Sequence, residues 1–148
     1  MTAPGRPSAK PHGWAWLTLA LSLAVHVIDE AAHDFLSVYN PAVFTIRERV
    51  PWLPLPVFQF GEWITGLAAA VLLLLVLSRW AFAGARWLVW ASFPLGALML
   101  LNGLGHVAAS LYTRSWMPGV YSSPLLIASS LWLLRTAARR IKAPAYPG

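Results

Sequence analysis

Long apolar stretches separated by short polar segments are the feature that most restricts the fold of this chain. Hydrophobic residues make up 58% of the sequence and charged residues only 11%, whereas a soluble domain carries about 25% charged residues. In lipid, only helices and closed barrels satisfy their own backbone, and a spanning helix needs about 20 apolar residues. We therefore expect an all-α fold, an integral membrane bundle of four transmembrane helices at about 14–36, 57–77, 87–111 and 120–137.

The remaining segments are predicted to lie outside the membrane core. Residues 1–13 and 139–148 should form disordered basic tails, which would place His12 in a tail and outside any site. Residues 44–56, rich in prolines, aromatics and charges, should lie at the membrane interface. A competing interpretation makes Trp14–Val25 a signal peptide cleaved after Ala24. The unbroken helical pattern through Leu36 favours an uncleaved span.

The basic residues are distributed unequally between the two sides of the expected membrane. With four spans, Arg47, Arg49 and Arg114 fall on one side, and the other eight of the eleven basic residues share the side of both termini. The positive-inside rule then predicts a multi-pass protein of the cell (inner) membrane with both termini cytoplasmic. Because these charges sit in loops and tails, the expected partner is the lipid bilayer, and no nucleic acid is expected.

Ionisable residues cluster near the end of the first expected span. His26, Asp29, Glu30 and His33 occur within eight residues, and on a helix they share an arc of about 100°. Each acid at the centre of a bilayer costs about 2.5–3.5 kcal/mol, whereas each Leu or Val returns only about 0.3–0.6 kcal/mol. A chain that keeps two such acids is expected to use them.

The expected topology brings polar residues of two other spans to the same depth. Glu62 begins the second span, and Asn102 and His106 lie near the end of the third, so all would occupy the outer half of the bilayer. Three histidines and three carboxylates without cysteine suit Fe, Mn or Zn, as one or two divalent ions. The predicted metal ligands are His26, Asp29, Glu30, His33, Glu62 and His106. Three of them, Asp29, Glu30 and His106, are also candidate catalytic acid–base groups. Asn102 is expected to contact the ligands without binding the ion.

Several motifs resemble those of the HXXEE family of small multi-pass membrane proteins. The segment His26–Glu30 is followed by Asn40-Pro41, and Asn102-Gly-Leu-Gly-His106 is followed by Pro118-Gly119. The chain has Asp29 where the family has Glu, which keeps the charge and shortens its reach. The resemblance implies a four-helix membrane protein with a site at these motifs, and it implies no particular reaction. Gly105 and Ala109 also form a small-xxx-small pair, which permits close approach of a neighbouring helix.

These observations favour an integral membrane metalloenzyme that acts on a lipophilic small-molecule substrate. A metal-free acid–base relay and a purely structural polar network remain open interpretations of the same residues. A proton-coupled transporter or small-molecule carrier is the main alternative function, with a homodimer supplying its second repeat. An accessory subunit that pairs through its charged helix face is another. No nucleophile motif, phosphate loop or dinucleotide fingerprint narrows the reaction.

Overall fold

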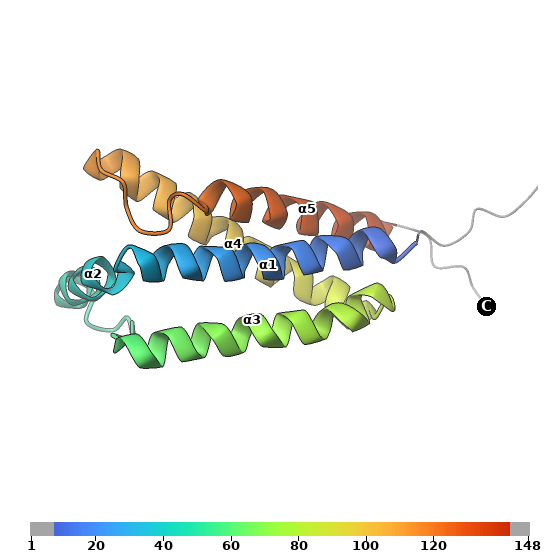
Figure 1. Ribbon diagram of the computed structural model, residues 1–148, viewed down its shortest axis with the longest axis horizontal. Helices are drawn as coiled ribbons and strands as arrows, with labels where there is room; N and C mark the ends of the chain where they lie inside the picture. The colour runs from blue at the N-terminus through green and yellow to red at the C-terminus, as the bar shows by residue number, and fades with distance from the viewer. Residues whose placement is uncertain (1–7, 143–148) are drawn as a thin grey trace, which may run out of the picture.

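The computed structural model describes residues 8–142, and this part of the chain contains five helices and no strand. Four long helices run side by side in alternating directions, and a shorter one lies at one end of the bundle (Figure 1). The all-α prediction is confirmed, whereas the expected number of four helices is wrong. The helices are α1 (Lys10–Ala32), α2 (Phe35–Arg49), α3 (Phe60–Phe82), α4 (Arg86–Thr113) and α5 (Ser123–Lys142).

Helix α1 is the centre of the bundle. It packs against α3 on one side and α5 on the other, and α4 packs on α5 while hardly touching α1 or α3. Trp16, Leu19 and Leu23 of α1 are almost fully buried, together with Leu126 and Leu133 of α5. The polar cluster predicted in the first span is therefore carried by the helix with the most helix neighbours.

Three helices, α1, α3 and α4, are long and apolar enough to cross a membrane. Helix α5, expected as a fourth span at 120–137, is not among them, because hydroxyl and basic residues dilute its apolar sequence. Its Ser129, Ser130 and Thr136 are buried and bond carbonyls of their own helix. By contrast, Leu72 and Leu73 of α3 are more than half exposed, as expected for side chains that face lipid.

The first span was expected to continue to Leu36, but α1 ends at Ala32. Asp34 takes the left-handed conformation (φ 51°) between α1 and α2, which Asp tolerates better than most residues. His33 lies at this break, and Nδ1 of its ring is 2.8 Å from the backbone oxygen of Asp29. The same carbonyl accepts a hydrogen bond from the backbone nitrogen of His33 at 3.2 Å, which closes the last turn of α1.

Asn40-Pro41 lies inside α2, so it does not end the first span as expected. Asn40 instead ties α2 to the following loop, because its side chain exchanges two hydrogen bonds with the backbone of Phe58. The expected interfacial segment 44–56 is divided between the end of α2 and this loop. Glu62 bonds the backbone nitrogen of Gln59 at 3.2 Å and caps the beginning of α3.

The expected tails are partly helical. Residues Lys10–Gly13 belong to α1, with Pro11 in its first turn, a position that lacks an intrahelical N–H bond. His12 is only 1% exposed, and its Nε2 lies 2.9 Å from Oγ of Ser92. Placing it in a tail is therefore wrong. Helix α5 likewise continues to Lys142, and the expected tail residues 1–7 and 143–148 lie outside the described residues.

Candidate metal centre

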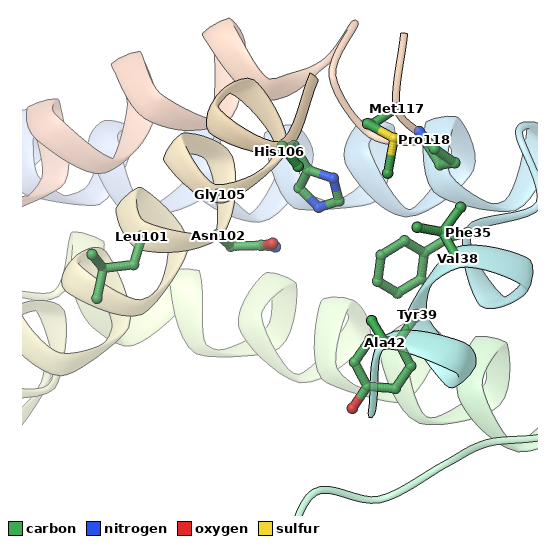
Figure 2. Close-up of a pocket in the computed structure, with 11 residues that line it drawn as sticks. Phe35, Val38, Tyr39, Ala42, Leu101, Asn102, Gly105, His106, Met117 and Pro118 are labelled. Carbon is green, nitrogen blue, oxygen red and sulfur yellow. The ribbon is translucent and has the colours of Figure 1, made fainter. Parts of the chain in front are cut away.

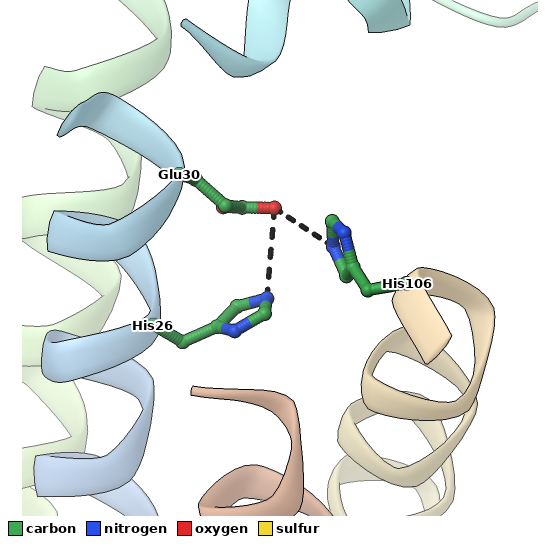
Figure 3. A group of neighbouring side chains, drawn as sticks. All are labelled: His26, Glu30 and His106. Atoms are coloured by element: carbon green, nitrogen blue, oxygen red, sulfur yellow. Dashed lines mark ion pairs between the residues drawn. The ribbon is translucent and has the colours of Figure 1, made fainter. Parts of the chain in front are cut away.

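His26, Glu30 and His106 meet near the end of the bundle where α1 and α4 end (Figures 1 and 3). His26 and Glu30 are one turn apart on α1 and share a face, and His106 reaches them from α4. Oε1 of Glu30 lies 3.0 Å from Nε2 of His106 and 3.6 Å from Nε2 of His26. All three residues are buried, with exposures of 0% for His26, 4% for Glu30 and 9% for His106.

The spacing of these three atoms suits a single metal ion. The potential ligand atoms lie within 4.8 Å of one another. Ligands bonded at about 2.0–2.1 Å stand about 3.3–3.4 Å apart around a tetrahedral ion. Around an octahedral ion adjacent ligands stand about 3.0 Å apart. The two separations from Oε1 of Glu30, 3.0 and 3.6 Å, are close to these values, and the ligand nitrogens of the two histidines lie within 4.8 Å of each other.

Ser122, just before α5, determines which nitrogen of His26 faces this group. Oδ2 of Asp29 accepts hydrogen bonds from the backbone nitrogen of Ser122 at 2.9 Å and from its hydroxyl at 2.7 Å. A carboxylate that accepts two such bonds takes the hydroxyl hydrogen. The carbonyl of Gly119 is a second acceptor for this hydroxyl, at the longer distance of 3.2 Å. With the hydrogen on the shorter contact to Asp29, Oγ of Ser122 accepts from Nδ1 of His26, which lies 2.8 Å away. This network assigns the proton of neutral His26 to Nδ1.

Nε2 of His26 therefore carries a lone pair, and it is directed at a carboxylate oxygen. This nitrogen is buried and has no hydrogen-bond partner among the described residues. Two facing lone pairs 3.6 Å apart repel each other, and burial removes the water that would relieve them. A cation between His26 and Glu30 removes this conflict, so the local chemistry fits a metal ion.

The segment between α4 and α5 closes over the two histidines. Gly119 has φ 84°, a conformation that favours glycine. A Cβ at this position would lie 2.8 Å from Cε1 of His106 and 3.0 Å from Cε1 of His26. Gly119 is therefore required both by its backbone conformation and by the space that the two rings occupy.

The other predicted site residues lie around this group rather than in it. Asp29 contacts Ser122 on the far side of His26 from Glu30, and the side chain of His33 is 48% exposed and lies beside Asp29. Glu62 is exposed at the beginning of α3. Asn102 is half-buried on α4, one turn before His106. The structure thus brings together three of the six predicted ligands, which is the set for one ion.

Ser122 was missed by the sequence analysis, and Gly119 was noticed only through its Pro-Gly motif. A serine between an apolar helix and a turn carries no signal of its own. The separation of 93 residues between Asp29 and Ser122 also places their contact beyond any helical spacing rule.

A cavity of about 370 Å³ lies between α2 and α4, beside His106. We call it the His106 cavity; its wall includes Phe35, Tyr39, Leu101, Asn102, Gly105, His106 and Ala109. Figure 2 shows the side chains of Asn102 and His106 extending from α4 toward α2. A second cavity of about 340 Å³, the Glu62 cavity, lies between α2 and α3, and Phe35 and Tyr39 line both.

Gly105 and Ala109 line the His106 cavity. Their spacing would permit close approach of a helix, but they do not make such a contact. A Cβ on Gly105 would meet no atom within 4 Å. Two other glycines of α4 provide the close helix contact. A Cβ on Gly96 or Gly103 would lie 2.8 Å from a side-chain carbon of Leu134 or Ile127 in α5.

Comparison with known proteins supplies a family and no activity. No curated protein and no solved structure matches the chain. A family model described as "Protein of unknown function with HXXEE motif" matches residues 14–133. The match includes His26 and Glu30 of the motif, His106, and the Gly119–Ser122 segment that packs on them. This chain therefore belongs to the HXXEE family, as its motifs suggested.

Proposed function

We propose that this protein is an integral membrane metalloenzyme whose His26, Glu30 and His106 hold one divalent cation and whose substrate is lipophilic. The orphaned Nε2 of His26 is the observation that carries this proposal. A buried polar atom without a partner is rare in folded proteins. Here it points at a carboxylate and a second imidazole, which are further ligands of the same metals.

Two histidines and one carboxylate are a ligand set that leaves coordination positions open. This set occurs in catalytic zinc sites and in non-haem iron oxygenases. Zn, Fe and Mn are accordingly the candidate ions. A cation with an open position supplies Lewis acidity, either to polarise a substrate oxygen or to lower the pKa of bound water.

The protein residues around the ion would hold and orient it. Ser122 and Asp29 would keep the lone pair of His26 Nε2 directed at the ion, as carboxylate-linked partners of metal-bound histidines commonly do. Gly119 would close the site on the side of α5. The apolar wall of the His106 cavity would exclude water and admit a molecule from the hydrocarbon phase.

We further propose that the site lies toward the outer surface of the cell membrane. Arg47, Arg49 and Arg114 are at the end of the bundle that carries the site. The opposite end carries more positive charge: Lys10, Arg79, Arg86, Arg135, Arg139, Arg140 and Lys142. Under the positive-inside rule this basic end, with both termini, is cytoplasmic.

Metal content of the purified protein tests the metal site. The full chain, solubilised in detergent and equilibrated separately with Zn²⁺, Mn²⁺ and Fe²⁺ under anaerobic conditions, should retain one ion per chain by elemental analysis. Glu30→Gln and His106→Ala should lose this ion while keeping the helical circular-dichroism spectrum. Glu62→Gln, which changes an exposed carboxylate at the same end of the bundle, is the control and should retain it. Equal metal content in all four proteins would refute the site.

Substrate conversion tests the enzymatic part of the proposal. Membrane lipid extract incubated with metal-loaded wild-type protein should show product ions by mass spectrometry that are absent with Glu30→Gln. Metal binding without any such product would contradict an enzyme and leave a metal-binding membrane protein.

A further inference from the structure

The His106 cavity has features that define a class of molecule. Its volume of about 370 Å³ lies at the small end of the range of ligand pockets, about 300–1,000 Å³. The described residues of its wall are apolar except Tyr39, Asn102 and His106. The hydroxyl of Tyr39 already donates to the backbone oxygen of Pro56. Asn102 and His106, one helical turn apart, are thus the polar groups left for a molecule in the cavity.

The cavity opens toward the side of the bundle. Leu101 is 66% exposed and Gly105 is also exposed, and both belong to its wall. Helix α4 is one of the helices able to cross a membrane, so this side faces hydrocarbon if the bundle is embedded. A molecule dissolved in the bilayer can then enter without crossing water.

We propose that the His106 cavity binds an amphiphile with one hydrocarbon chain and a terminal oxygen-bearing head group, such as a fatty alcohol, aldehyde or acid. This inference rests on the proposed function, because the head group would face the metal site. The chain lies between α2 and α4, against Phe35 and Leu101. The head group lies at Asn102, whose amide donates a hydrogen bond, and at His106 beside the ion.

Gly105 offers a way to fill the cavity without disturbing the bundle. A Cβ there meets no atom within 4 Å, so Gly105→Leu places its side chain in the space of the hydrocarbon chain. Gly61 of α3 is a matched control, since a Cβ there also meets nothing within 4 Å and the residue lines neither cavity. Ala109→Leu fills the same cavity one turn later and serves as a second variant.

Photolabelling of the full metal-loaded chain in detergent micelles tests the proposal. The probe is palmitic acid with a diazirine in mid-chain, and labelling is quantified by mass spectrometry of peptides. Labelling at Leu101–Ala109 is divided by labelling at Leu72–Val76, a stretch of α3 whose exposed Leu72, Leu73 and Val76 report unspecific contact. Gly105→Leu and Ala109→Leu should lower this ratio about tenfold or more, and Gly61→Leu should leave it unchanged. Hexadecanol should compete with the probe, and hexadecane, which has no head group, should not.

The outcomes separate this inference from the metal proposal. An unchanged ratio in both cavity variants, or equal competition by hexadecane, would overturn the inference. Metal content is measured on the same samples, and Gly105→Leu should retain its ion. Preferential labelling of a wild-type chain that binds no metal would uphold the cavity and refute the metal site. A bound ion without preferential labelling would refute the cavity alone.

Discussion

Replacing Ser122 with alanine tests whether the residues behind His26 control the metal site. Ser122→Ala removes a hydroxyl that lies 2.8 Å from Nδ1 of His26 and 2.7 Å from Oδ2 of Asp29. No metal ligand is altered. The backbone nitrogen of Ser122 still donates to Asp29 at 2.9 Å. The change therefore leaves the carboxylate one donor short and the imidazole N–H without its acceptor.

The size of the effect follows from these contacts. Loss of a partner behind a metal-bound histidine lowers metal affinity about 10–100-fold, which corresponds to about 1.4–2.7 kcal/mol. A buried unsatisfied polar group costs about 1–3 kcal/mol of stability. The free energy of unfolding of the apoprotein should fall by less than the upper end of this range. The reason is that Asp29 keeps its backbone partner and His26 can move its proton to Nε2, where Glu30 accepts it.

This proton shift provides a spectroscopic measurement. In wild-type protein the ¹⁵N chemical shifts of His26 should indicate a proton on Nδ1, and in Ser122→Ala they should indicate a proton on Nε2. Metal affinity is measured in parallel by competition with a chelator of known affinity. Ser130→Ala is the matched control. Ser130 of α5 is also buried, and its hydroxyl donates to the carbonyl of Leu126 in its own helix.

Two results would refute the reasoning about Ser122. If Ser122→Ala bound metal as tightly as Ser130→Ala, the Asp29–Ser122–His26 chain would have no role in orienting the ligand. If the wild-type apoprotein already carried its His26 proton on Nε2, that nitrogen would donate to Glu30. The lone-pair conflict that supports the cation would then not exist.

Three further predictions concern the same end of the molecule. Glu30→Ala should abolish metal binding, whereas Asp29→Ala should lower affinity about 10–100-fold, because Asp29 acts through Ser122; equal loss of the ion by elemental analysis would contradict this difference. Gly119→Ala should destabilise the protein by about 1–3 kcal/mol, since φ 84° is strained for alanine and its Cβ meets both histidine rings; an unchanged melting temperature would refute this packing. A reporter fused after Lys142 should be active on the cytoplasmic side and one inserted at Ser115 on the outer side; the reverse would invert the proposed topology.

Helical periodicity was enough to predict most of the long helices and to place His26 and Glu30, two members of the His26–Glu30–His106 group, together. His26 and Glu30 are one turn apart, so any helix through them places both on one face. Alternation of the spans brought His106 to the same depth. These predictions succeeded because they depend on backbone geometry that the residue spacing alone determines.

The break at Asp34 and the location of His12 could not be predicted in this way. A single left-handed residue ends α1, although Ala31, Ala32, Phe35 and Leu36 continue the apolar pattern. His12 looked like part of a tail because Pro11 and Gly13 flank it. Pro11 is compatible with a first helical turn. His12 is buried, and its Nε2 lies 2.9 Å from Oγ of Ser92 in α4. Both outcomes depend on tertiary contacts that leave no periodic signal.

Glu62 was predicted as a ligand from its depth, and depth alone does not give direction. Its carboxylate turns back to the backbone nitrogen of Gln59 in a capping box, because the first turn of α3 needs acceptors for its free N–H groups. His33 likewise turns toward the end of its own helix. Local bonds at helix ends thus hold Glu62 and His33, two of the six predicted ligands, outside the His26–Glu30–His106 group.

The order of helices in space has a consequence for biosynthesis. Helix α4 reaches α1 chiefly through α5, which follows the other four helices in the described part of the chain. If α1 enters the bilayer before the later helices are translated, two partners of its acids are still missing: His106 follows Glu30 by 76 positions, and Ser122 follows Asp29 by 93. During this interval two acids lie at the lipid surface, each at a cost of about 2.5–3.5 kcal/mol if centrally placed. A nascent chain that stops at the end of α4 therefore holds His26, Glu30 and His106 but lacks Ser122, the residue that bonds both Asp29 and His26.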